Sequence, residues 1–237
     1  MPRAANPTLR EDILNAALQI VEEKSTAGLT MRAVAGALGY SATAIYQHFK
    51  SKEELLLALK IKAGDLLSQE MERARQEPTL EEQLFQMGRR YIRFGLENPT
   101  YYQLIFQDTH LDPSCSPEQT KRMRHSWSIM RGTMQTWVEE HGFQGIDIDQ
   151  EANVLWMMVH GLTSLALAGR LPSAQPDDVF ALFDLFGSRW MAGLLSTQPH
   201  LPKPPPKRDG VQNVCRHARR PGYSRDRGKS NESPISR

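Results

Sequence analysis

Small hydroxylated side chains, an aromatic ring and several basic groups follow one another between residues 41 and 52. Hydroxyl, amide and ammonium groups are the usual protein partners of base edges and DNA phosphates. The hydroxyl and methyl of Thr43 suit a base edge, whereas Tyr46 and Lys52 suit phosphates. With two residues from the segment before them, the side chains that we expect to contact DNA are Thr30, Arg32, Ser41, Ala42, Thr43, Tyr46, Gln47, His48, Lys50 and Lys52.

Two short helices are expected to position these side chains. Thr30 is placed to cap a helix over residues 31–38, and Ser41 is placed to cap a second helix over residues 42–49. Gly39 lies between them and suits the left-handed conformation that a tight turn requires. This arrangement is typical of a helix-turn-helix, whose second helix enters the major groove with its N-terminal residues at the base edges.

The order of residues in this segment resembles the TetR/AcrR family of transcriptional regulators. The resemblance is strongest over residues 29–35 (Leu-Thr-Met-Arg-Ala-Val-Ala) and over residues 39–55, which contain the run Tyr-Gln-His-Phe-Lys-Ser-Lys-Glu-Glu-Leu. The contacts that the resemblance implies are to phosphates for Tyr46, His48 and Lys52, and to bases for Ser41, Thr43 and their neighbours.

Two further motifs resemble one subgroup of that family, whose C-terminal domain is named for a Trp…His-Gly signature (the WHG type). They are residues 156–161, Trp-Met-Met-Val-His-Gly, and residues 98–106, which are similar to the subgroup's Pro-x-x-Tyr-x-Leu-x-Phe stretch. With the N-terminal motifs, the resemblance extends over roughly residues 9–197. It implies a homodimer joined by a four-helix bundle and a ligand pocket between the helices of the second domain.

Methionine and aromatic residues recur at helical spacing in the second half of the chain. Met adapts its shape and aromatic rings offer flat apolar walls, so such a set suits an apolar or aromatic ligand. For any single residue, core packing is the simpler interpretation of the same spacing. The residues that we expect to line a ligand pocket are Met87, Tyr91, Phe94, Tyr102, Phe106, Trp127, Met130, Met134, Trp156, Met157 and His160.

The segments before residue 199 have a helical pattern, because apolar residues recur with a 3.6-residue period and no segment shows sustained alternation. We predict an all-α fold of about nine helices, three of them N-terminal and the others over residues 52–76, 80–97, 99–108, 117–141, 148–170 and 177–196. The expected domains are a helix-turn-helix domain over residues 1–55, a ligand-binding and dimerisation domain over residues 56–198, and a disordered Pro/Arg/Lys-rich tail over residues 199–237.

The formal net charge of +2 averages three unequal segments. Residues 1–62 carry +2, residues 63–198 carry −7, and residues 199–237, with ten basic and three acidic side chains, carry +7. The last segment is also rich in proline and poor in apolar residues, which predicts disorder. It is either a solvated extension or an arm that binds nucleic acid non-specifically. DNA would repel the acidic segment, which favours contact through the N-terminal domain.

Several classes of function are not expected. The sequence has no nucleophile elbow, no phosphate loop and no paired histidine spacing of a zinc site, so we expect no catalytic residue, no metal site and no cofactor. Two cysteines are too few for a disulfide framework, and neither a signal sequence nor an apolar run of about 18 residues is found. We therefore expect a cytoplasmic protein with no membrane partner.

The function that we expect is a transcriptional regulator, most simply a repressor. It would bind a palindromic operator of double-stranded DNA as a homodimer, and a small-molecule effector would release it. The alternatives are an activator that uses the same N-terminal domain and a helical adaptor that binds proteins. Sequence-selective DNA binding with a steep salt dependence would separate a regulator from an adaptor.

Overall fold

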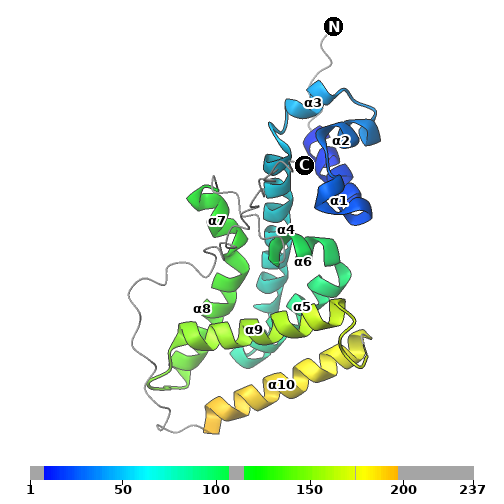
Figure 1. Cartoon of the computed structure of the whole chain (residues 1–237). Coiled ribbons are helices and arrows are strands. Elements are labelled where there is room, and N and C mark those ends of the chain that lie inside the picture. The colour runs from blue at the N-terminus through cyan, green and yellow to red at the C-terminus, as the bar shows by residue number, and fades with distance from the viewer. Residues whose placement is uncertain (1–7, 107–114, 174, 197–237) are drawn as a thin grey trace, which may run out of the picture. The chain divides into compact units, whose positions relative to one another are not determined.

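The computed structural model describes residues 8–106, 115–173 and 175–196, which contain ten helices and no strand (Figure 1). The helices are α1 (Leu9–Gly28), α2 (Met31–Leu38), α3 (Ala42–Tyr46), α4 (Lys52–Ala74), α5 (Leu80–Glu97), α6 (Pro99–Phe106), α7 (Pro117–Met123), α8 (His125–Glu140), α9 (Ile148–Leu167) and α10 (Pro176–Ser196). The expected all-α class is confirmed. The predicted tail over residues 199–237 lies outside the described residues.

Side-chain caps and a glycine turn define the helix-turn-helix. The Thr30 hydroxyl accepts a hydrogen bond from the amide of Ala33 at 3.0 Å, and the Ser41 hydroxyl accepts one from the amide of Ala44 at 3.3 Å. Each cap satisfies a backbone donor that the first turn of its helix leaves without a partner. Gly39 has a φ of 69°, the left-handed conformation that ends α2. These features confirm the predicted helix-turn-helix.

The helix expected over residues 42–49 is shorter than predicted, because α3 ends at Tyr46 and the chain then turns. The amides of His48 and Phe49 still reach the carbonyl oxygen of Ile45, at 2.9 and 3.0 Å. The backbone of Ser51, with φ −154° and ψ 169°, is extended because Ser51 is the N-cap of α4. The approaching start of α4 therefore limits α3 to little more than one turn.

Ile45 and Phe49 anchor α3 to the rest of the N-terminal domain. They are 0% and 1% exposed, and they share a core cluster with Ile13 of α1, Val34 of α2 and Leu55 of α4. Complete burial of a large apolar side chain contributes about 1.5–3 kcal/mol. These two anchors therefore fix the orientation of α3 and leave its other face to solvent.

α4 belongs to both parts of the molecule (Figure 1). The Ser51 hydroxyl accepts from the Glu54 amide at 3.2 Å, and the Glu54 carboxylate accepts from the Lys50 amide at 2.6 Å, so both residues before the helix are tied to its first turn. The first turns of α4 pack against α1 through Leu55, and the helix also contacts α5, α6, α7 and α8. The predicted domain boundary after residue 55 thus falls inside one continuous helix.

The single helix expected over residues 117–141 is two helices, which raises the predicted nine to ten among the described residues. The break lies at Arg124, which has φ −96° and ψ 2°. At this point α7 packs closely on α4, since a Cβ atom at Gly64 would lie 3.2 Å from the Cα atom of Met123. Arg122 also pairs with Asp65 of α4. Packing against α4 therefore redirects the chain between α7 and α8.

A second core cluster joins α5, α8, α9 and α10. Trp137 is 0% exposed, and its ring centroid lies 6.0 Å from that of Trp190. Trp137 Nε1 donates to Glu81 Oε1 at 2.6 Å, which lowers the pKa of that carboxyl, and Trp190 Nε1 donates to Glu151 Oε2 at 3.1 Å. These two indole–carboxylate bonds connect α8 to α5 and α10 to α9.

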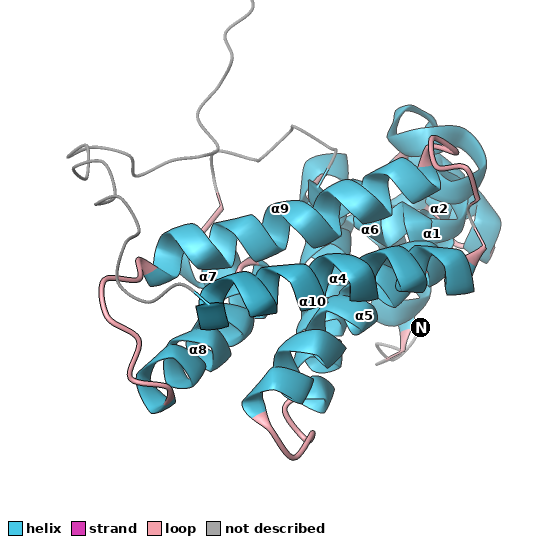
Figure 2. Cartoon of the chain, turned by 90° about the horizontal axis from the view of Figure 1, so that it is seen from below, coloured by secondary structure: helices cyan, strands magenta, loops and turns pink. Residues whose placement is uncertain are grey.

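α9 and α10 run side by side (Figure 2) and leave several large apolar side chains in solvent. The exposed ones are Met157, Leu165, Leu182, Leu185, Phe186 and Leu195. Among the described helices, α10 alone is long and apolar enough to cross a membrane, with 28% of its apolar window buried. Length and composition are the whole basis of that finding, and a packed helix of a soluble protein meets the same criteria.

Candidate DNA-binding surface and ligand-binding cluster

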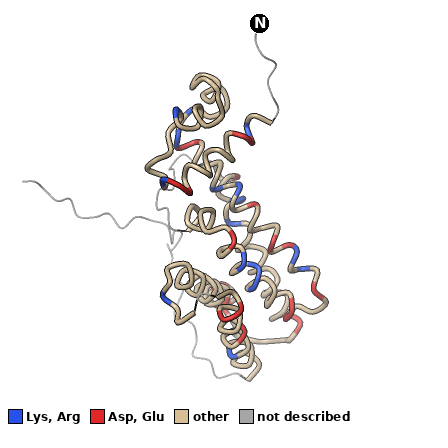
Figure 3. Tube along the Cα trace, turned by 90° about the vertical axis from the view of Figure 1, so that its right-hand side faces the viewer, with Lys and Arg blue, Asp and Glu red and all other residues tan. Residues whose placement is uncertain are grey.

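The ten side chains expected to contact DNA lie on the helix-turn-helix, on the turn after α3 and at the start of α4, and none of them is buried. The exposed ones are Thr30, Arg32, Ser41, Thr43, Tyr46, Gln47 and Lys50, and the half-buried ones are Ala42, His48 and Lys52. Figure 3 shows Lys and Arg positions on this part of the chain. We call this set the DNA-binding surface from here on.

The chemistry of the DNA-binding surface follows from its caps and its exposed groups. The hydroxyls of Thr30 and Ser41 accept backbone hydrogen bonds, so each still has a proton to donate to a phosphate oxygen. Thr43 is exposed in the first turn of α3, the part of a recognition helix that reaches base edges. Tyr46 is 51% exposed, and Lys50, in the turn after α3, is exposed too. Such groups neutralise or hydrogen-bond phosphates.

Five of the side chains expected at the ligand pocket form one aromatic cluster between α5, α6 and α9. The Tyr102 ring centroid lies 5.0 Å from that of Phe106 and 6.1 Å from that of Tyr91. The His160 ring is stacked between Trp156, at 5.1 Å, and Tyr102, at 5.6 Å. Aromatic centroids 4.5–7 Å apart are in favourable contact.

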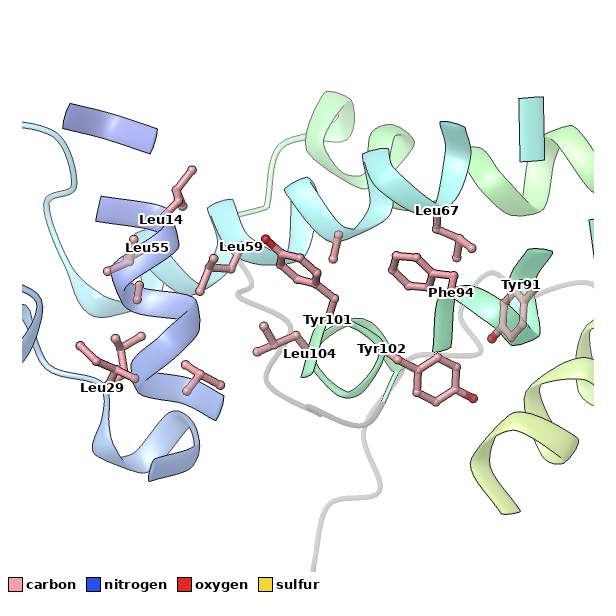
Figure 4. Close-up of a cluster of buried hydrophobic side chains, with 14 of the residues drawn as sticks. Leu14, Leu29, Leu55, Leu59, Leu67, Tyr91, Phe94, Tyr101, Tyr102 and Leu104 are labelled. Carbon is pink, nitrogen blue, oxygen red and sulfur yellow. The ribbon is translucent and has the colours of Figure 1, made fainter. Parts of the chain in front are cut away.

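The polar atoms of the aromatic cluster meet at His160. The hydroxyls of Tyr91 and Tyr102 lie 3.1 and 2.9 Å from its Nδ1 atom. The Tyr102 hydroxyl also donates to the His160 carbonyl oxygen at 3.1 Å and lies 2.9 Å from Ser164 Oγ. Figure 4 shows Tyr91 and Tyr102 in the core with their hydroxyls toward α9.

Burial keeps this cluster uncharged. It raises the pKa of Tyr91 and of Tyr102 above the ordinary value of 10.0, and it lowers the pKa of His160 below 6.5. Desolvation acts in this direction because it disfavours the charged form of each group. The cluster therefore offers neutral hydrogen-bonding groups among aromatic rings, a lining that suits an apolar or aromatic molecule.

The other side chains expected at the pocket are divided among three places. Met87 and Phe94 are buried in the same core as the aromatic cluster, and Met130 packs against both cores. The remaining three are apart from the cluster: Met134 lies in the second core, the half-buried Trp127 packs against that core, and Met157 is 57% exposed on α9. Ser164 was not among the expected residues, although it lies one helical turn after His160 and bonds to the cluster.

A groove of about 500 Å³ lies along α4 near the start of α8. The residues that line it are all polar or charged: Asp65, Ser68, Gln69, Glu72, Arg73 and His125. None of the side chains expected at the ligand pocket lines it. Among the described residues, no group of three His, Cys, Asp or Glu side chains is placed to hold a metal ion.

Two family models match the chain. Residues 13–59 match the model described as "Bacterial regulatory proteins, tetR family", and residues 84–186 match the model described as "Tetracyclin repressor-like, C-terminal domain". The two matches together cover well over half of the chain. The first spans the DNA-binding surface, and the second contains the aromatic cluster.

Several proteins are similar to this chain. An uncharacterized HTH-type transcriptional regulator of Mycobacterium tuberculosis is 24% identical over 171 residues, which are 72% of this chain and 76% of that protein. A solved protein of unknown function from Rhodococcus is 24% identical, with a TM-score of 0.68 over 80% of this chain and 98% of its own. FadR of Bacillus subtilis, solved with stearoyl-CoA, is 15% identical, with a TM-score of 0.61 over 77% and 98%. The solved structures share the fold.

Proposed function

Because the chain belongs to the tetR family of bacterial transcriptional regulators, we propose that it represses transcription by binding a palindromic DNA operator as a homodimer in the cytoplasm. A small-molecule effector bound in the second domain releases it from DNA. The observation that carries the proposal is the DNA-binding surface itself, in which ten polar, basic or small residues stay unburied on helices fixed by an apolar core.

The exposed apolar face of α9 and α10 supports the homodimer. Six large apolar side chains of these two helices are exposed, among them Leu185 at 48% and Phe186 at 51%. Single exposed apolar residues are common on soluble proteins, but a group of them marks an interaction surface. A Cβ atom at Gly161 or Gly193 would meet nothing within 4 Å, so both positions leave room for a partner helix. Two copies paired through these helices form a four-helix bundle.

The aromatic cluster supports an apolar or aromatic effector. FadR of Bacillus subtilis, which has this fold, was solved with stearoyl-CoA, so the fold is compatible with a long acyl ligand. We place the chain in the WHG-type subgroup, whose signature here ends at Gly161. Its Trp156 and His160 rings stack with their planes 21° apart, which gives two of the signature residues a shared place in the cluster.

α4 supplies the coupling between the effector and DNA. Lys62 of α4 pairs with Glu11 and bonds to Asn15 Oδ1 at 3.1 Å, so a shift of α4 moves α1 and the helix-turn-helix with it. The two half-sites of a palindrome lie about 34 Å apart on one face of DNA. An effector that changes this spacing prevents simultaneous binding of both half-sites, for which a coupling free energy of about 1–3 kcal/mol is sufficient.

Selection of duplexes from a random-sequence pool by the full-length protein tests the proposal. We expect an inverted repeat to be enriched and its affinity to fall steeply between low and moderate salt, since phosphate contacts release counterions. Failure to enrich any duplex at low salt would refute DNA binding. An enriched single half-site bound by a monomer would refute the homodimeric operator complex.

Three variants separate the roles within the DNA-binding surface. Thr43→Ala should change the preferred sequence, since a base contact is worth about 1–3 kcal/mol of discrimination. Lys52→Ala should weaken binding to all sequences alike, since phosphates carry no sequence information. Lys121→Ala, an exposed lysine of α7, is the matched control and should bind as the wild type does. Unchanged affinity and preference for Thr43→Ala would disprove its base contact.

A further inference from the structure

An arginine outside the DNA-binding surface lies against the end of the helix-turn-helix. Arg10, in the first turn of α1, has its guanidinium carbon 4.9 Å from the centroid of the Phe49 ring. Phe49 follows α3 and is 1% exposed, whereas Arg10 is exposed. The guanidinium is thus stacked on a core ring while it remains in contact with solvent.

The charge of Arg10 is not neutralised by a described carboxylate. The acidic residue next to it, Glu11, pairs with Lys62. Arg89 is a useful contrast, because it lies 5.4 Å from the Phe180 ring centroid but also pairs with a carboxylate, that of Asp184. A stacked guanidinium whose donors are not used by a carboxylate is ordered in advance for an anion.

Phe49 places Arg10 beside predicted phosphate contacts. His48 and Lys50 precede and follow Phe49 in the turn after α3, and the Lys50 side chain is exposed. Arg10 of α1 therefore lies near these two residues, although they belong to a different part of the N-terminal domain. The Arg10 guanidinium thus lies close to the turn that carries these two predicted phosphate contacts.

We propose that Arg10 is a further phosphate contact and binds the DNA strand that Lys50 also contacts. The inference rests on the proposed function, and it extends the DNA-binding surface from α2, α3 and α4 to α1. The planar guanidinium donates two parallel hydrogen bonds to a phosphate, and its stack on Phe49 reduces the motion that binding must arrest. Since the contact is to phosphate, it raises affinity without changing sequence preference.

The test measures duplex affinity against salt concentration for full-length Arg10→Gln and Arg10→Lys. The probes are the duplex enriched by selection and a scrambled duplex of equal length. Arg10→Gln should lower the magnitude of the slope of log K, the association constant, against log salt by about 0.9 for each bound N-terminal domain. It should also weaken binding to both probes on the order of tenfold at about 0.1 M salt. Arg10→Lys keeps the charge but loses the planar fork, so it should retain the slope with an intermediate affinity.

Arg93→Gln is the matched control, because Arg93 lies over the Phe180 ring at 5.6 Å and belongs to the second domain. It should leave affinity and slope unchanged. Loss of the stack on Phe49 could lower the melting temperature and the active fraction, but it would not change the slope. An unchanged slope for Arg10→Gln would therefore overturn the inference. A wild-type protein that enriches no duplex would instead overturn the proposed function on which it rests.

Discussion

Removal of one hydroxyl from the aromatic cluster, by Tyr102→Phe, should destabilise the folded protein. Tyr102 is 0% exposed, and its hydroxyl lies 2.9 Å from His160 Nδ1, 3.1 Å from the His160 carbonyl oxygen and 2.9 Å from Ser164 Oγ. Phenylalanine keeps the ring, so the contacts with Phe106 and the other rings are unchanged. The substitution therefore isolates the hydrogen bonds.

The magnitude follows from which partners are left without a bond. The Tyr91 hydroxyl, 3.1 Å from His160 Nδ1, still satisfies that nitrogen, and the His160 carbonyl lies inside α9, where the helix also supplies a donor. The Ser164 hydroxyl is the group that loses its partner within the cluster. Ser164 is half-buried, so its hydroxyl can bond to water instead, and the free energy of unfolding should fall by the net value of one hydrogen bond, about 0.5–1.5 kcal/mol.

Urea unfolding at one fixed protomer concentration measures this change, since the stability of the proposed dimer would depend on concentration. Tyr40→Phe is the control, because Tyr40 is half-buried and its hydroxyl bonds to no described residue; its effect should stay within about 0.5 kcal/mol. A Tyr102→Phe protein as stable as the wild type would refute the reasoning. If the losses in unfolding free energy of Tyr102→Phe and Ser164→Ala added exactly in the double variant, the reasoning would be refuted too, since the effects of bonded residues couple by about 0.5 kcal/mol or more.

Three further predictions concern pH, association and packing. Burial lowers the pKa of His160 below 6.5, so the contribution of the neutral ring to stability is full above pH 6.5 and is lost as the pH falls. His160→Gln should therefore flatten the decline in melting temperature below pH 6.5. An equal decline in the variant and the wild type would contradict this. Phe186→Glu places a charge in the exposed face of α10 and should yield monomers in light scattering, whereas Gln144→Glu, in the exposed loop before α9, should stay dimeric. Gly88→Ala puts a Cβ atom into the Phe183 ring, and this overpacking should cost about 1–3 kcal/mol, which outweighs the helix-propensity gain of about 1 kcal/mol. The variant should therefore unfold at a lower urea concentration than the wild type, and a higher urea midpoint would disprove the prediction.

Local signals were sufficient to predict the helix-turn-helix. The caps at Thr30 and Ser41 bond to amides three residues later, so the whole interaction is contained in a short stretch of sequence. The left-handed turn at Gly39 is equally local. The end of α3 was misplaced because it depends on where α4 begins, and the extended backbone of Ser51 decides that point.

Interactions between distant residues account for the errors in the second domain. The break at Arg124 depends on the close packing of Met123 on Gly64, and nothing in the sequence around residue 124 indicates it. Helical spacing predicted correctly that Met134 is buried, but it could not tell which core would bury it. The same spacing gave no sign that Met157 faces solvent, because an exposed apolar face, such as the one proposed here as the dimer interface, has the composition of a core.

The tryptophans of the chain are distributed very unevenly. All four, Trp127, Trp137, Trp156 and Trp190, lie on α8, α9 and α10, and the helix-turn-helix has none. Intrinsic tryptophan emission therefore reports on the second domain alone. If a duplex changes that emission, the signal must have travelled through the protein from the N-terminal domain. The chain thus contains an unlabelled optical probe of communication between its two domains, with Trp156 placed in the aromatic cluster itself.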